Sequence, residues 1–182
     1  RLQEDIELVQ AQGTPTSETR QDAARLLYAQ AVDLYEAGDL EQTVALLDEL
    51  RGLDADYQRE NVDTMLSKAH YQLGLNAVAE NRLDDAIEHF EAVLAMKPGD
   101  EEAQDQLNLA GLYSAALNYW EIDWSATIQA LKGLYTLAPE YKDVRFRLRD
   151  AYLYAAQDHA DEQHDEKAVL VHHQGPVDPV FQ

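Results

Sequence analysis

The chain has 182 residues, of which 35 are Asp or Glu and 14 are Lys or Arg, so its formal net charge is -21. Such an acidic surface repels phosphate groups, which argues against nucleic-acid partners and against binding to anionic membranes. The absence of cysteine excludes disulfides, thiolate metal sites and cysteine nucleophiles. An apolar content of 46%, with few glycines and prolines, favours long helices over disorder or an all-β fold, and no apolar run is long enough to insert into a bilayer.

The N-terminal residues combine a short amphipathic stretch with a linker. Leu2, Ile6 and Val9 share one helical face, and residues 13–17 have the Gly, Pro, Ser and Thr composition of a linker. We interpret residues 1–18 as an arm and linker, with a frayed helix packed on the next segment as the alternative. Because the sequence begins with Arg1 and not Met, we read it as a fragment or a processed product.

Three segments repeat one helical pattern, beginning at Leu40, Leu83 and Trp124, at offsets of 43 and 41 residues. Their matching columns are Thr43, Ala86 and Thr127; Leu47, Phe90 and Leu131; Leu50, Val93 and Leu134; and Leu53, Met96 and Leu137. This spacing is the stripe of an amphipathic helix of about 14 residues. We call the three predicted helices B.

A second, longer pattern precedes each helix B and predicts a helix A. A small residue stands nine positions before each opening residue, at Ala31, Gly74 and Ala115, where another helix can approach closely. Upstream columns hold Val62, Ala103 and Val144; Leu66, Leu107 and Leu148; and Ala69, Ala110 and Ala151. The last member of each column indicates a fourth copy. There Asp165 replaces the opening apolar residue, so its helix B is expected to be short or frayed.

Short turns connect these helices. Asp39, Asn81 and Asp123 are predicted N-caps of helices B, and turns this tight force antiparallel hairpins. Prolines follow the second and third helices B and stop them. The predicted copies span about 19–56, 57–99, 100–140 and 141–174, and Gly and Pro make residues 175–182 a tail.

These residues resemble the tetratricopeptide repeat (TPR) family. The family's small residue, early Ala, large residue and final Pro are matched by Gly74, Ala86, Phe90 and Pro98 in the second copy, and by Ala115, Thr127, Leu131 and Pro139 in the third. The period is 41–43 residues instead of about 34, which we interpret as about two added turns on helix A. The resemblance implies an all-α, right-handed helix-hairpin solenoid of about three and a half repeats.

In solenoids of this family helices A line the concave side, so the resemblance implies a groove formed by one face of each helix A. That face is apolar and aromatic here, and at i, i+4, i+7 spacing it holds Tyr28, Val32 and Tyr35, then Tyr71, Leu75 and Val78, and then Leu112, Ala116 and Tyr119. Trp120 lies beside Tyr119, and Leu153 takes the Tyr28 column in the fourth copy. Tyrosine and tryptophan dominate interface energies, so we expect an extended or helical peptide segment to bind there. The alternatives are that the chain's own arm or tail fills the groove, or that these side chains form core. Val32 and Leu75 stand where the carboxylate clamp of some members needs Asn, so that clamp is rejected.

The sequence contains no recognisable motif for catalysis or for cofactor binding. The glycines are isolated, so no phosphate-binding loop is present. His159 and His164 lie five residues apart and do not share a helical face, and His70 and His89 fall in columns that we read as structural. We therefore expect no catalytic residue, metal site or cofactor, and no enzymatic activity.

The expected function is a protein-protein interaction scaffold. Its acidic surface would steer a protein or peptide with basic flanks toward it. The alternative is a structural spacer or self-association domain, for example a homodimer, whose groove is filled by its own segment. Bacterial repeat proteins with this long period resemble parts of larger, anchored chains, which favours an extracytoplasmic part of an anchored bacterial protein.

Overall fold

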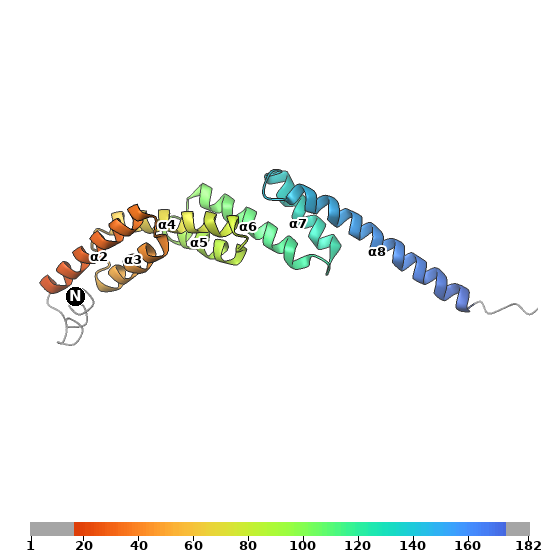
Figure 1. Cartoon of the computed structure of the whole chain (residues 1–182), viewed down its shortest axis with the longest axis horizontal. Coiled ribbons are helices and arrows are strands. Elements are labelled where there is room, and N and C mark those ends of the chain that lie inside the picture. The colour runs from red at the N-terminus through yellow and green to blue at the C-terminus, as the bar shows by residue number, and fades with distance from the viewer. Residues whose placement is uncertain (1–16, 174–182) are drawn as a thin grey trace, which may run out of the picture. The chain divides into compact units, whose positions relative to one another are not determined.

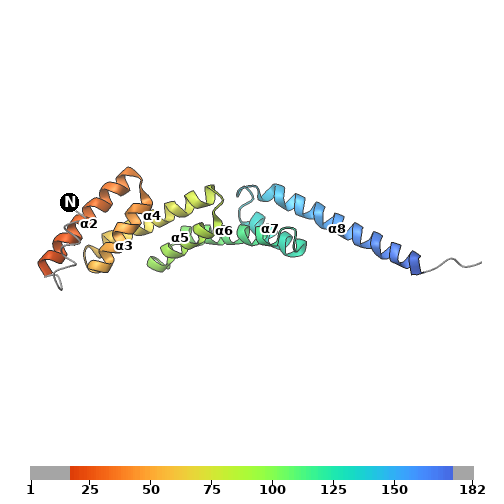
Figure 2. The same cartoon turned by 60° about the horizontal axis from the view of Figure 1, so that its bottom comes forward.

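The computed structural model describes residues 17–173, which contain seven helices and no strand (Figures 1 and 2). The all-α prediction is thus confirmed for this part of the chain. The predicted arm, apart from its last two residues, and the predicted tail lie outside the described residues. Within residues 17–173, no helix combines the length and the apolar character that crossing a lipid bilayer requires.

The chain divides into two compact units, Arg1–Ala110 and Gly111–Gln182. The helices are α2 (Ser17–Ala37), α3 (Leu40–Leu53), α4 (Arg59–Ala79), α5 (Leu83–Met96), α6 (Glu101–Tyr119), α7 (Trp124–Leu137) and α8 (Val144–His173). In the first unit α2 pairs with α3, α4 pairs with α5, and α3 also packs on α4. Helix α6 begins in the first unit and continues into the second, where α7 packs on α8.

The three predicted helices B are observed as α3, α5 and α7. Each has 14 residues and begins and ends at the predicted positions. Three of their four columns are wholly buried, at 0% exposure: Thr43, Ala86 and Thr127; Leu47, Phe90 and Leu131; and Leu50, Val93 and Leu134. The repeated stripe in the sequence is therefore the core-facing side of each helix.

Two of the three upstream helix A columns are buried in the same way, whereas in the third Leu66 is buried but Leu107 and Leu148 are half-buried. The close approach predicted at Gly74 is confirmed. Val62, Ala103, Val144, Ala69, Ala110 and Ala151 are at most 1% exposed. A Cβ on Gly74 would lie 2.6 Å from Cε1 of Phe90, so α4 and α5 meet where no larger side chain fits. In the third copy Ala115 is only half-buried, whereas Tyr113 and Ala116 are buried, so the buried face of α6 shifts after Ala110.

Two of the three predicted N-caps are confirmed. An Asp39 oxygen accepts from the Gln42 amide at 3.3 Å, and an Asp123 oxygen accepts from the Ala126 amide at 2.9 Å. The third prediction is wrong, because the N-cap of α5 is Arg82, which makes no side-chain cap bond.

Backbone geometry explains why Asn81 does not cap α5. Each turn from a helix A to a helix B contains one residue with positive φ: Gly38 at 83°, Asn81 at 63° and Glu121 at 63°. Asparagine tolerates this left-handed conformation better than most residues. Asn81 therefore satisfies the geometry of the turn, and the capping position falls on the next residue.

The predicted short fourth helix B is also wrong as a separate element. Residues 165–169 continue α8, which runs without interruption from Val144 to His173. No Gly or Pro occurs in this span, and Ala, Gln and Glu are good helix formers, so nothing in the local sequence produces a turn. A match to the helix B columns therefore does not create a hairpin without its own turn signal.

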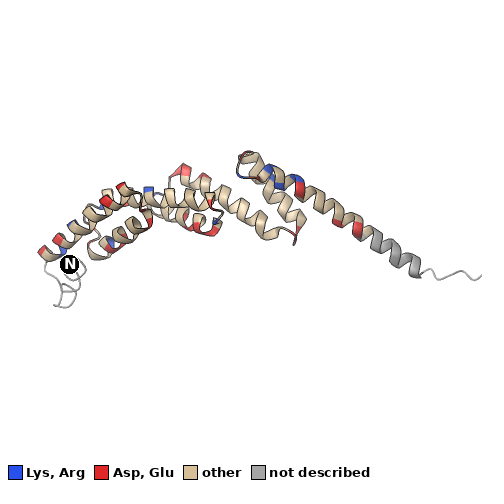
Figure 3. Cartoon of the chain, in the orientation of Figure 1, with Lys and Arg blue, Asp and Glu red and all other residues tan. Residues whose placement is uncertain are grey.

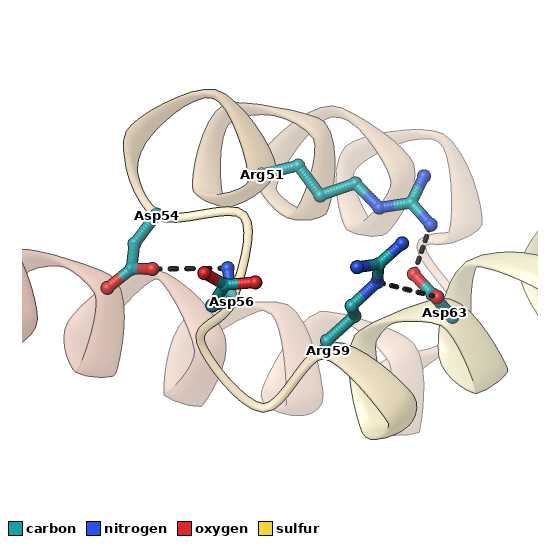
Figure 4. A network of polar contacts seen from close by, with 5 residues as sticks. All are labelled: Arg51, Asp54, Asp56, Arg59 and Asp63. Carbon is teal, nitrogen blue, oxygen red and sulfur yellow. Dashed lines mark hydrogen bonds and ion pairs between the residues drawn. The ribbon is translucent and has the colours of Figure 1, made fainter.

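Charged side chains fasten the junction between α3 and α4 (Figure 4). Arg51 of α3 reaches across to Asp63 of α4, and both side chains are about one-third exposed. Arg59 Nε lies 3.9 Å from the other Asp63 oxygen, and Asp54 accepts a hydrogen bond of 3.2 Å from the amide of Asp56. The loop and the first turn of α4 are thereby held against the end of α3.

We predict that Gly74→Ala destabilises the protein by about 1–3 kcal/mol, measured by chemical denaturation, because the new methyl group overlaps the buried Phe90 ring. The same substitution in a Phe90→Leu background should cost less, since the other two copies combine Ala31 with Leu47 and Ala115 with Leu131.

Gly111→Ala is the matched control, because Gly111 is also within a helix but nothing lies within 4 Å of its Cβ position. It should stabilise the protein by about 0.5–1 kcal/mol through helix propensity alone. Equal effects of the two substitutions would contradict the close contact at Gly74.

A second prediction concerns two threonines in one column, both at 0% exposure. Thr43 Oγ1 donates to the Asp39 carbonyl at 2.7 Å, whereas Thr127 Oγ1 has no partner within the described structure. Because Thr→Ala removes the same methyl group at both sites, Thr43→Ala should be the more destabilising by about 1 kcal/mol in thermal unfolding. A larger loss for Thr127→Ala would show that its hydroxyl is bonded.

Candidate functional site

A groove of about 730 Å³ opens along α4 in the first unit, and we call it the α4 groove. Its walls are Tyr35, Gly38, Leu40, Ser67, Lys68, Tyr71, Gln72, Asn76, Lys97, Asp100 and Glu102. They come from α2, the start of α3, one face of α4, the C-cap of α5 and the start of α6. Tyr35 and Tyr71, both predicted for the partner-binding groove, are brought together here.

Helix α4 supplies the floor of the groove because it is buried on its other sides. Lys68, Gln72 and Asn76 follow one another at intervals of four residues and form one polar stripe. The Gln72 amide donates to the Asn76 side-chain oxygen at 3.1 Å, which orders the stripe. Leu66 and Ala77 lie in the core at 0% exposure, so the polar stripe is directed away from it.

Tyr71 is positioned by the close contact between α4 and α5. Its ring packs edge-on against Phe90, with centroids 5.8 Å apart, and Phe90 occupies the space that Gly74 leaves open. Burial raises the pKa of Tyr71, and the nearby carboxylates of Glu102 and Asp100 raise it further. Tyr71 therefore presents a protonated hydroxyl at neutral pH, on a ring that cannot move freely.

The charges of the α4 groove are mixed, although acidic residues predominate over the described surface (Figure 3). Neither Lys68 nor Lys97 has an ion pair among the side chains that the structure describes. On the other border Asp100 accepts a hydrogen bond of 3.1 Å from the Ala103 amide, which caps α6, and Glu102 lies beside it. The groove thus offers two ammonium groups and two carboxylates within one site.

The other residues predicted in the first unit have different surroundings. Tyr28 packs on the core between α2 and α3 and contacts the Tyr57 ring edge-on at 6.1 Å. Leu75 and Val78 pack against the cluster around Phe90, so they contribute to the core. Val32 is half-buried and does not line the α4 groove.

The predicted residues of the second unit are dispersed. Leu112 is half-buried and faces Gly133 of α7, and Ala116 is fully buried. Tyr119 and Leu153 are exposed, at 46% and 62%. Trp120 belongs to an aromatic cluster that fixes α8.

In that cluster the Trp120 ring contacts Trp124 and Tyr154 edge-on, while Trp124 and Tyr154 stack at 5.3 Å. The Arg147 guanidinium lies over Trp120 at 5.4 Å and donates to the Tyr113 hydroxyl at 3.0 Å. Burial, followed by the hydrogen bond to Asp143, raises the pKa of Tyr113 to about 12. These contacts join α6, α7 and α8 around Trp120.

Sequence reasoning missed most of the polar lining of the α4 groove. The spacing of Lys68, Gln72 and Asn76 is a signal that a search for polar helical stripes would have found. Lys97 and Asp100 carry no such signal, because they reach the groove from the turn between α5 and α6.

A pair of histidines lies between α4 and α5 in the first unit. The Nδ1 atoms of His70 and His89 are 3.1 Å apart, as in a hydrogen bond between neutral rings. Burial, and then the charge of His89, lowers the pKa of His70, and burial is also the main reason that the pKa of His89 is lowered. The charged neighbours are Asp48, Arg51, Asp85, Arg82, Glu88 and Glu41. Searched over the described residues, the chain shows no group of three His, Asp or Glu side chains suited to a metal ion.

Neither a known protein-family model nor a curated protein matches this sequence.

The histidine pair predicts a specific pH dependence. Because the pKa of each folded-state imidazole lies below the ordinary 6.5, the unfolded chain binds more protons as the pH falls below 6.5. Their contribution to stability is therefore present above that pH and is lost on acidification. Replacing both by Leu should flatten the dependence of the free energy of unfolding on pH below about 6.5, measured by urea titrations.

The single substitutions His70→Leu and His89→Leu are the comparison for this experiment. Each should flatten the curve less than the paired substitution, because burial lowers the pKa of both imidazoles. A single substitution that flattens the curve as much as both together would show that only one of the two rings is the cause.

Proposed function

We propose that this chain is a TPR-like, right-handed helix-hairpin solenoid of about three and a half repeats that acts as a non-enzymatic interaction scaffold. It binds an extended or helical segment of a partner protein in the α4 groove. The repeated 14-residue helices with matching buried columns support the assignment of the repeat. The single observation that carries the binding function is the groove itself, in which Tyr35 and Tyr71 stand among polar and charged side chains.

The lining of the groove favours a peptide over a small molecule. Two tyrosine rings provide contact area at little cost in conformational entropy, and the stripe of Lys68, Gln72 and Asn76 offers donors spaced along a helix. Donors in a row suit the successive carbonyl groups of a peptide backbone. An opening bordered by α2, α4 and α6 also leaves the groove accessible along its length.

The charges indicate what kind of segment fits. Lys68 and Lys97 complement an acidic side chain of the partner, whereas Asp100 and Glu102 complement a basic one. The net charge of -21 steers basic flanks toward the chain. We therefore expect a segment that carries one acidic residue between basic flanks.

The alternative is a structural spacer or self-association domain whose groove is filled by its own segment. The segments available for that role are residues 1–16 and 174–182, which lie outside the described residues. The two functions differ in one measurable respect, because a groove filled from within the chain excludes added peptide until that segment is removed.

Selection of a random phage-displayed peptide library against the whole chain tests the proposal. Tyr71→Ala and Lys68→Ala should each weaken the selected peptides by about 1–3 kcal/mol, measured by calorimetry, because both side chains line the groove. Tyr135→Ala is the control, since Tyr135 is an exposed tyrosine of α7 outside the groove. It should leave the affinity unchanged.

Peptides that bind all three variants as they bind the wild type would contradict the α4 groove as the site. Peptides that bind only after residues 1–16 or 174–182 are removed would support the self-filled alternative. Unfolding of each variant by urea separates a loss of binding from a loss of folding.

A further inference from the structure

The two imidazoles between α4 and α5 form a contact that the proposed function leaves unused. His70 lies on α4, four residues before Gly74, and His89 lies on α5, directly before Phe90. The contact between Gly74 and Phe90 holds the two helices close together near this point, which fixes the backbone of both histidines. The two side chains therefore approach each other from closely packed helices.

The geometry of the pair is close to that of two ligands of one metal ion. The Nδ1 atoms are 3.1 Å apart and the ring centroids 5.3 Å apart, so the rings point at each other through their Nδ1 edges. Two Zn–N bonds of about 2.0–2.1 Å at a tetrahedral angle place the two nitrogens about 3.3 Å apart. A divalent ion can therefore replace the bridging proton after a small tilt of each ring. Both side chains are half-buried, so part of the pair stays in contact with solvent.

Both imidazoles are neutral at pH 7, which is the form that binds metal. Burial is the main reason that the pKa of each lies below its ordinary value of 6.5. In a hydrogen bond between neutral rings, one Nδ1 carries the proton and the other accepts it. When both Nδ1 atoms bind an ion, that proton moves to Nε2 of the same ring. The two imidazoles therefore release no proton when an ion binds above pH 7.

The charges around the pair favour a cation. The carboxylates whose charges act on the two rings are Asp48, Asp85, Glu88 and Glu41. Arg51 and Arg82 oppose them, but Arg51 is engaged by Asp63 and Arg82 by Glu80. The net charge of -21 also raises the concentration of cations near the chain.

We propose that His70 and His89 bind one divalent ion of the zinc type through their Nδ1 atoms, with water in the remaining positions. Ions such as Zn²⁺ and Ni²⁺ favour imidazole, whereas Mg²⁺ favours oxygen ligands. The bound ion links α4 to α5 and stabilises this helix pair. With two protein ligands instead of three or four, the site is weak and reversible. The histidines are 19 residues apart, which is no helical chelate spacing, so the sequence did not indicate this site.

Calorimetric titration of the whole chain with Zn²⁺ tests the site, at about pH 7.5 and with about 5 mM Mg²⁺ to occupy the acidic surface. In the parent protein for this test Gln replaces the other four histidines, which are His159, His164, His172 and His173. The chain has no cysteine, so no thiolate competes for the ion. The parent protein should bind one Zn²⁺ per chain.

Variants of the pair show whether the two rings act together. In the parent protein His70→Gln and His89→Gln should each weaken Zn²⁺ binding at least about tenfold, because a single imidazole cannot chelate. The double variant should lie within about threefold of the single ones, since either substitution already breaks the chelate. A parent protein that binds no Zn²⁺, single variants that bind as the parent does, or a double variant far weaker than either single one would overturn the proposal.

The nitrogen chemical shifts of the imidazoles provide a test that needs no substitution at the pair. In the same parent protein Zn²⁺ should shift the Nδ1 resonances of both rings and leave both Nε2 atoms protonated, whereas Mg²⁺ should change neither ring. A response of one ring only, or coordination through Nε2, would overturn the proposal. Neither histidine lines the α4 groove and no peptide is used, so these results do not bear on the proposed function.

Discussion

The contact between Gly74 and Phe90 is the constraint on which the first unit depends. A ring at 0% exposure stands within 2.6 Å of the place where any other residue would carry a Cβ, so α4 and α5 meet closely only with glycine at this position. The same ring supports Tyr71 from behind at 5.8 Å. The close packing of Gly74 against Phe90 therefore determines how α4 and α5 pair, and it also positions Tyr71 in the α4 groove.

The periodic parts of the fold could be predicted from the sequence, whereas its local departures could not. Columns such as Leu47, Phe90 and Leu131 reveal the helices because burial selects apolar residues at a fixed helical interval. The spacing of buried residues carries no information about the geometry of the turns between helices. Asn81 has a residue type that suits both an N-cap and a left-handed turn, and only the backbone decides between them. Likewise, the columns continue past Ala151 although no turn signal interrupts α8.

The candidate site was predicted in part, for a related reason. Helical spacing places Tyr28, Tyr71 and Trp120 on one kind of face, but it does not show which rings find partners on another element. Tyr57, from the loop after α3, contacts Tyr28, and Tyr154 of α8 contacts Trp120. Those contacts give both rings a partner on another element. Lys97 enters the groove from the opposite direction, since a turn brings it beside α4. Helical periodicity does not predict contacts between elements. Those contacts determine which side chains remain available for binding.

The scarcity of basic residues makes the positions of the unpaired ones informative. With 35 acidic residues for 14 basic ones, an ion pair is the easiest state for any cation on this surface. Most of the described arginines form an ion pair within their own unit, as Arg51 does with Asp63 and Arg147 does with Asp143. Lys68 and Lys97 have no ion pair among the described side chains, and both line the α4 groove. Unpaired cations next to apolar contact area are what recognition of an acidic group requires, because a carboxylate brought there gains a pair without breaking one. In the α4 groove we expect the bound segment to supply such a carboxylate.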